Sequence, residues 1–333
     1  MAGNANYGTD LLSSTFETYM RDQPSDVIFG DLVLFDVLAQ KGKVTKKGGL
    51  KVLEPLMYAK STAVGSYSGW DTLDTSPQQG LTNAEFDWKQ YYGTVAISAQ
   101  EELQNQGPAA QLDILKARFE QAKMSLADAM NADMFLDGTG NSSKDITGLA
   151  LMVDSAGTYG NIVRSTNTWW SANETAVGGA LAIAGSTGMR RMYNDCSLGR
   201  GRMTPDFIVT TQIGYEAYEA VMDPNMRFSN NGDQNVGFKN QNLVFRNASL
   251  FWDDYCQSGI MYFLNSKVMR LVVMPGRDGG VNSGEDRDRG DFRTEPFQTP
   301  INQDGKVAKF FWMGQLTSSN CRHLGKSTGI TNT

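Results

Sequence analysis

The feature that most constrains the fold is a long amphipathic segment at residues 108–137. Its apolar residues recur at alternating spacings of three and four, at Leu112, Leu115, Phe119, Ala122, Leu126 and Ala129. This period is typical of a helix with one buried face. Pro108 suits the first helical turn, and Gly138 suits a left-handed cap after the last one. We therefore predict one long helix with Leu112, Leu115, Phe119 and Leu126 in its core contacts.

A second unusual region lies between residues 41 and 97, where two strand-like stretches flank a long polar connection. The first stretch is LKVLEPLMY, whose Pro55 suits a sheet edge, and the second covers residues 86–97. Residues 59–83 between them cannot form a core, yet they carry exposed-looking large side chains at Val64, Tyr67, Trp70 and Leu73. We expect a long hairpin in which Tyr67, Trp70 and Leu73 contact another molecule. A disordered surface loop is the alternative.

The first forty residues also contain more apolar surface than a short segment can bury. Asp10 can cap a helix that runs to about residue 22, and Pro24 ends it. An apolar stretch follows at residues 27–38. We expect the aromatic side chains of the helix and of this apolar stretch to contact a partner molecule. These side chains are Phe16, Tyr19, Phe29 and Phe35. Burial in the chain's own core is the alternative.

The remainder of the chain reads as short elements of both kinds. The pattern predicts a short strand in GLALMV, helices at 174–184 and 187–195, a strand at 206–211, a helix at 212–222 and meander strands from Leu243 onward. Residues 225–242 and 275–291 are predicted loops, and the last strands fall within VAKFFWMGQLTSSNCRHLG.

Composition excludes several functional classes. The net charge of −6 gives no basic field for nucleic acid, and there is neither a signal peptide nor an apolar run of membrane-spanning length. The three widely spaced cysteines form no C-x-x-C pair. The single histidine, His323, follows no nucleophile elbow, and residues 325–327 match a phosphate-binding loop only by chance. We therefore assign no catalytic residue, metal site or cofactor.

The order of these parts resembles the major capsid proteins of tailed bacteriophages, which have the Hong Kong 97-type shell fold. The resemblance covers nearly the whole chain and is carried by the arm, the hairpin with its glycine-rich tip, the spine helix ending in MNADMFLDGTG, the phrase TPDFIVTTQIGYEAYEAV and the strands from LVFRNASLFWDD to VMRLVV. It implies an α+β fold with an N-terminal arm at 1–40 and an extended loop at 41–97. A peripheral domain at 98–164 and 298–333 would carry the spine helix. A mixed α/β axial domain would cover 165–297.

The resemblance implies a structural, non-enzymatic function. Its members self-assemble as hexamers and pentamers into the icosahedral head of the virion, in the host cytoplasm, around a double-stranded DNA genome. The implied partners are a portal protein, decoration proteins and DNA held by weak contacts, with no membrane. We expect a separate scaffolding protein, because no charged helical segment precedes the arm. The alternatives are an encapsulin-like nanocompartment shell and, from another class, a small-ligand-binding or hydrolytic protein.

Overall fold

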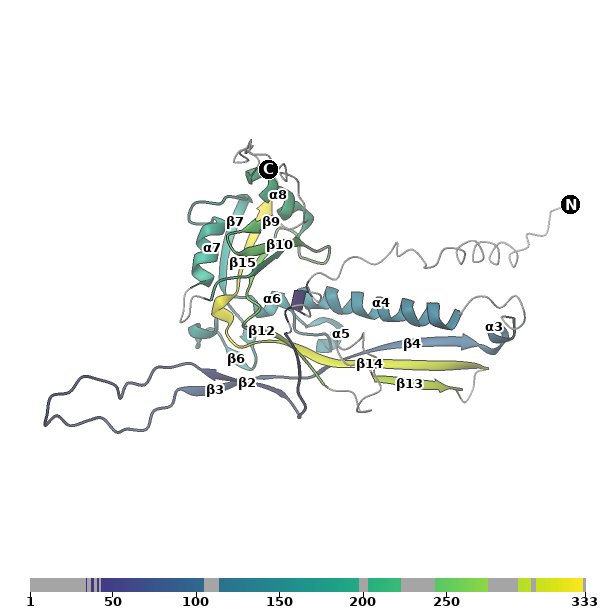
Figure 1. Ribbon diagram of the computed structural model, residues 1–333, viewed down its shortest axis with the longest axis horizontal. Coiled ribbons are helices and arrows are strands. Elements are labelled where there is room, and N and C mark those ends of the chain that lie inside the picture. The colour runs from purple at the N-terminus through teal and green to yellow at the C-terminus, as the bar shows by residue number, and fades with distance from the viewer. Residues whose placement is uncertain are drawn as a thin grey trace, which may run out of the picture. The chain divides into compact units, whose positions relative to one another are not determined.

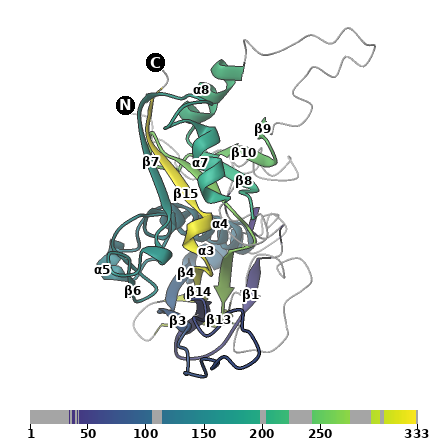
Figure 2. The same cartoon turned by 90° about the vertical axis from the view of Figure 1, so that its left-hand side faces the viewer.

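The computed structural model describes residues 34, 37, 38, 41, 43–104, 114–197, 203–222, 243–274, 293–300 and 304–331 (Figures 1 and 2). Several predictions lie outside these residues: the first helix, Phe16, Tyr19, Phe29, Phe35, Leu112, the start of the long helix, and the loops at 225–242 and 275–291. The side chains of Leu115 and Phe119 also lie outside them. The described residues form two compact units, one from residues 93–104, 114–128, 294–300 and 304–309, the other from the remaining described residues.

Arg118 organises the described part of the first unit. It lies on α4 (Ile114–Phe135), and its guanidinium donates two hydrogen bonds to Glu101 of α3 (Ala99–Gln104), at 2.8 and 3.0 Å. A further hydrogen bond of 2.9 Å reaches the carbonyl of Ala96 in β4 (Lys89–Ser98). The Arg118 hydrogen bonds lower the pKa of Glu101 to about 2, with help from the Ser98 backbone. This pair therefore stays ionised at neutral pH.

The described part of the long helix is helical as predicted, but only part of the predicted apolar stripe is buried, since Leu126 is buried whereas Ala129 is exposed. Its second half buries Leu126, Met130, Met134 and Phe135, and the helix ends at Phe135. Gly138 has a φ of +81°, in the left-handed region that glycine favours. A Cβ at Gly148 would come within 2.3 Å of the Met134 carbonyl oxygen. Residue 148 must therefore be glycine for the chain to pass this close to the helix end.

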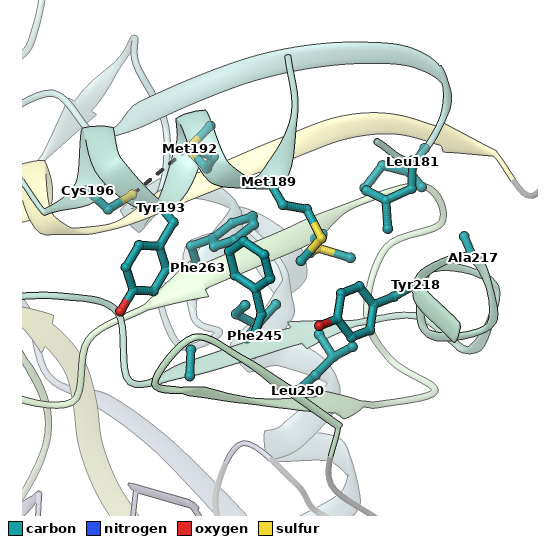
Figure 3. Close-up of a cluster of buried hydrophobic side chains, with 14 residues drawn as sticks. Leu181, Met189, Met192, Tyr193, Cys196, Ala217, Tyr218, Phe245, Leu250 and Phe263 are labelled. Atoms are coloured by element: carbon teal, nitrogen blue, oxygen red, sulfur yellow. Dashed lines mark hydrogen bonds between the residues drawn. The ribbon is translucent and has the colours of Figure 1, made fainter. Parts of the chain in front are cut away.

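The second unit contains a six-stranded sheet in the order β7-β15-β11-β8-β10-β9. Its strands are β7 (Asn173–Ala180), β8 (Phe207–Thr210), β9 (Leu243–Phe245), β10 (Ala248–Trp252), β11 (Met261–Leu264) and β15 (Gly325–Thr331). One face packs against α7 (Met189–Cys196) and α8 (Gln212–Met222). Figure 3 shows side chains of both helices meeting Phe245, Leu250 and Phe263 of the strands. The predicted strand-helix unit at 206–222 is thereby confirmed.

Three sequence predictions are corrected here. The predicted helix at 174–184 is instead strand β7, because its burial alternates residue by residue and β15 pairs along it. GLALMV forms a helical turn, α6 (Leu149–Met152), rather than a strand. The strands after Leu243 are not a meander, because β8 lies between β10 and β11, in parallel with one and antiparallel to the other.

A five-stranded sheet holds most of the remaining strands. Its strand order is β1-β12-β14-β13, and β4 also pairs with β14. The bounds of these strands are Val44–Lys46 for β1, Met269–Val273 for β12, Arg293–Gln298 for β13 and Gly305–Ser318 for β14. The shorter elements are α5 (Gly140–Ser143), β5 (Thr158–Tyr159), β6 (Ile162–Val163), η1 (Thr168–Trp170) and η3 (Cys321–His323). None of the described helices is long and apolar enough to span a membrane.

The two final strands belong to different sheets. Strand β14 pairs with β12 in the five-stranded sheet, whereas β15 pairs with β7 and β11 in the six-stranded one. Strand β15 thus pairs with strands from residues 165–297, and the assignment of residues 298–333 to a peripheral domain stays a prediction.

Candidate interaction surface on the hairpin

The predicted hairpin is present as an antiparallel pair of β2 (Val52–Met57) and β3 (Leu81–Phe86). Val52 lies opposite Phe86, and Met57 lies opposite Leu81. The return strand therefore begins at Leu81 rather than at residue 86, and the stretch after it, β4, pairs with β14 instead. In Figure 1 the connection between β2 and β3 extends well beyond the ends of both strands.

The inner face of this pair is packed against its own unit. Val52, Glu54, Leu56, Ala84 and Phe86 are buried. The Phe86 ring meets the Tyr159 ring edge-on, with centroids 4.9 Å apart. Tyr159 in turn stacks on Trp170, whose indole N–H donates to the Tyr159 carbonyl at 2.9 Å. The base of the hairpin is thus held by an aromatic column from β5 and η1.

Glu54 places a charge on this buried face, where an unpaired carboxylate would be costly. Its Oε1 atom lies 2.8 Å from Lys47 Nζ, and its Oε2 atom lies 3.6 Å from an Arg270 nitrogen. Lys47 and Arg270 are both partly exposed, so cations at the edge of the buried face neutralise the charge of Glu54. The pairing fixes the first strand to the segment before it and to β12.

Gly160 supplies a test of how firmly this base is held. Its φ is +59°, and a Cβ there would come within 2.9 Å of Ala84 Cβ and of the Phe86 ring. Gly160→Ala is expected to lower the free energy of unfolding by roughly 1–3 kcal/mol, measured by urea denaturation. Gly178→Ala is the matched control, because Gly178 has a φ of +64° and open space around it. Equal losses in the two variants would mean that backbone strain, rather than packing on the hairpin, causes the effect.

The outer face and the tip of the hairpin are exposed and apolar. Leu53, Met57 and Leu81 point outward from the two strands. We call residues 61–79 the tip loop; all of its side chains are exposed except the half-buried Ala63. Its large residues are Val64, Tyr67, Trp70 and Leu73, and Trp70 has a relative accessibility of 102 %. The sequence prediction placed Tyr67, Trp70 and Leu73 on a surface, and the structure leaves all three uncovered.

The side-chain hydrogen bonds of the tip loop stay within the hairpin. Thr62 donates to Gln78 at 2.8 Å, and the Ser68 N–H donates to Asp71 at 2.8 Å. At its root, the Tyr58 N–H donates to Gly80 at 3.0 Å, and the Tyr58 ring stacks on Trp169 at 5.4 Å. The described contacts with the rest of the unit therefore end at the root, and the loop beyond it presents its apolar side chains outward.

The side chains that could take part in chemistry are buried or paired with other side chains. His323 is buried, and its Nδ1 atom lies 2.9 Å from the Cys196 carbonyl oxygen. Burial raises the pKa of the Cys196 and Cys256 thiols to about 12 and that of Cys321 to about 11, which disfavours their thiolates. Lys326 is paired with Asp154 and Glu174 at 3.1 and 3.3 Å. Within the described residues, no three acidic, histidine or cysteine side chains gather as a metal site.

Comparison with known proteins gives a likeness in structure alone. No protein-family model and no curated protein matches the chain. A chain of the cyanophage A-1(L) capsid aligns with a TM-score of 0.68 at 15 % identity, over 93 % of this chain and 95 % of that one. A chain from the capsid of a native GTA particle gives 0.58 at 13 % identity, over 99 % and 100 %.

A chain of an encapsulin complex is also similar in structure. A chain of the holo-SrpI encapsulin complex from Synechococcus elongatus PCC 7942 aligns with a TM-score of 0.57 at 9 % identity, over 96 % of both chains. Each of these structures aligns over at least 93 % of this chain, which itself mixes helices and sheets. The chain therefore has the Hong Kong 97-type α+β fold that the order of its sequence elements predicts.

Proposed function

We propose that this chain is a structural subunit that assembles with copies of itself into the closed head of a tailed bacteriophage. The observation that carries the proposal is the exposed apolar tip loop on a firmly packed hairpin base, in a chain with the fold of capsid subunits. Large exposed side chains grouped on one projecting loop are typical of a surface that another molecule covers. Identical copies provide the covering surface most simply, because each subunit both gives and receives the contact.

The same role explains why no catalytic arrangement is needed. A shell is stabilised by the apolar surface that neighbouring subunits bury against each other. A specific interface buries on the order of 1,000 Å² of accessible surface in total. The exposed outer face of β2 and β3 continues the apolar surface of the tip loop toward the base. Leu53, Met57 and Leu81 therefore extend the proposed contact beyond the three residues predicted from sequence.

The remaining partners are proposed from the resemblance. They are a portal protein, a scaffolding protein, decoration proteins and packaged double-stranded DNA, in a head assembled in the host cytoplasm. The net charge of −6 supports weak contacts between wall and genome, because an acidic protein does not attract phosphates over long range. Such contacts should weaken further as salt is added.

Negative-stain electron microscopy of the purified full chain tests the proposal. We expect closed shells under at least one assembly condition, either alone or with the scaffolding protein of the same phage. Monomers or small oligomers under every condition would contradict a shell role and favour the ligand-binding or hydrolytic alternative.

The encapsulin likeness supports a second candidate, a nanocompartment shell that encloses protein. The contents of particles isolated from the native source distinguish the two candidates. Nuclease-protected DNA is expected for a phage head, whereas a protein cargo without DNA would support the nanocompartment.

A further inference from the structure

A buried carboxyl group, Asp253, lies at the end of β10 in the second unit and joins three segments of the chain. It is only 2 % exposed. Its two oxygens accept from Asn131 Nδ2 of α4 at 3.3 and 3.1 Å, and Oδ1 also accepts from the Tyr255 N–H at 3.0 Å. The Leu34 backbone provides another hydrogen bond. Asp253 therefore ties the last turns of α4 to the six-stranded sheet and to residue 34.

No cation accompanies this carboxyl group among the described residues. The groups that face it are the amide of Asn131, backbone N–H groups, the acidic Asp254 and the Cys256 thiol. A buried carboxylate without a cationic partner is unfavourable, and a protein relieves the cost by retaining the proton. Burial raises the pKa of Asp253, and the neighbouring charge of Asp254 raises it further. The hydrogen bonds from Tyr255, Asn131 and the Leu34 backbone act in the opposite direction.

A second observation at the same place concerns Asn131. This residue is fully buried, yet its Oδ1 atom has no hydrogen-bond donor. An unsatisfied buried acceptor is unusual in a folded protein and costs roughly 1–3 kcal/mol. A protonated Asp253 would provide the missing donor, since the carboxylic acid and the carboxamide can exchange two hydrogen bonds after a rotation of the amide.

We propose that Asp253 keeps its proton in the folded chain above the usual carboxyl range and donates it to Asn131, so that this junction loosens as the pH rises. Because the folded state binds the proton more tightly than the unfolded state, the stabilisation is complete at low pH. It is lost as the pH rises through the pKa of the folded state. The junction therefore acts as a pH-sensitive attachment of α4 to the sheet, whatever the chain assembles into.

Asp253→Asn tests the proposal, because an asparagine keeps the shape and can exchange two hydrogen bonds with Asn131 without a charge. Urea denaturation of the full chain is measured from about pH 4 to about pH 8, around the usual carboxyl range. The folded-to-unfolded ratio of the variant, relative to the wild type, is expected to rise with pH by up to about tenfold per unit. A variant that loses stability equally at every pH, or increasingly toward alkaline pH, would overturn the proposal.

Asp206→Asn is the matched control. The Asp206 carboxylate is paired with Lys41 at 2.7 Å and accepts from the Ser266 N–H at 2.8 Å. This variant should lose stability, and the loss should not shrink as the pH rises. Should Asp253→Asn not fold, the infrared spectrum of Asp133→Asn decides, since burial also raises the pKa of Asp133. A protonated-carboxyl band that persists above the usual carboxyl range in that background supports the proposal, and its absence overturns it.

Discussion

Replacing the tip loop, residues 61–79, with a short Gly-Ser turn is expected to abolish shell formation while leaving the subunit folded. The loop contributes no fully buried side chain, and its side-chain hydrogen bonds stay within the hairpin. Its removal should therefore leave β2, β3 and the aromatic column at their base intact. We expect an unchanged circular dichroism spectrum and an unchanged urea midpoint, together with an absence of closed particles by electron microscopy.

The size of this effect follows from the side chains that the loop presents. Burying one large aromatic residue such as Trp70 contributes roughly 2–3 kcal/mol, at about 25 cal/mol per Å² of apolar surface. A shell repeats the contact at every subunit, so the loss accumulates over the particle. Trp70→Ala should therefore act in the same direction more mildly, raising the protein concentration needed for assembly. Ser66→Ala, an exposed neighbour in the same loop, should leave that concentration unchanged.

Two results would contradict this account of the loop. Unfolding of the truncated chain would mean that the loop belongs to the subunit's own core. Normal assembly of the truncated chain would mean that neighbouring copies do not hold the tip, and the interaction surface would have to be sought on the outer face of β2 and β3.

Arg164→Met is expected to cause a large loss of subunit stability. Arg164 is 1 % exposed, and its guanidinium donates to four backbone carbonyls. These belong to Leu151 at 2.7 Å, Met152 at 2.8 Å, Ala156 at 3.1 Å and Trp170 at 3.3 Å. The same guanidinium lies 5.3 Å from the centre of the Tyr159 ring. One side chain therefore satisfies the end of α6 and supports the aromatic column beneath the hairpin.

Methionine fills a similar volume but donates no hydrogen bond. Each unsatisfied buried carbonyl costs roughly 1–3 kcal/mol, and removing the buried charge returns part of that loss. We expect a net decrease of about 3–5 kcal/mol in the free energy of unfolding, measured by urea denaturation. Arg164→Lys should recover only part of it, because an ammonium group cannot reach carbonyls spread around a planar fork.

Arg191→Met provides the control for losing a surface arginine. Arg191 is exposed and paired with Asp195 one turn along α7, at 2.8 Å. Such exposed ion pairs contribute little to stability, so the free energy of unfolding of this variant should change by no more than about 0.5 kcal/mol. Similar losses at residues 164 and 191 would show that the carbonyl contacts of Arg164 are not what stabilises the subunit.

Elements with a clear period were predictable from sequence, and those defined by distant partners were not. The described part of α4 is helical as its spacing predicts, and the strand-helix unit of β8 and α8 has an apolar pattern that matches its burial. Strand β7 was misread because NETAVGGA has no distinctive local signal, and its conformation follows from pairing with β15 far along the chain. Strand β3 was placed too late because LTNAEF buries only Ala84 and Phe86.

The candidate surface was partly predictable for a similar reason. Tyr67, Trp70 and Leu73 could be found because large side chains in a polar loop have no core to enter. Leu53, Met57 and Leu81 were missed, since an apolar residue in a strand gives no indication of which face is covered. Arg164 was also missed, because its partners are main-chain carbonyls and no side-chain pattern reveals them.

The position of β15 between β7 and β11 affects how the chain can fold during synthesis. All the other strands of the six-stranded sheet precede it in sequence, yet β7 pairs only with β15 among the described residues. A ribosome must therefore make residues 325–331 before β7 can join the sheet, and contacts of such long sequence separation form slowly. Nascent chains that stop short would expose the edge of β11 and the unpaired β7. Only chains translated through β15 can complete the six-stranded sheet, so a prematurely terminated copy would lack one of its inner strands.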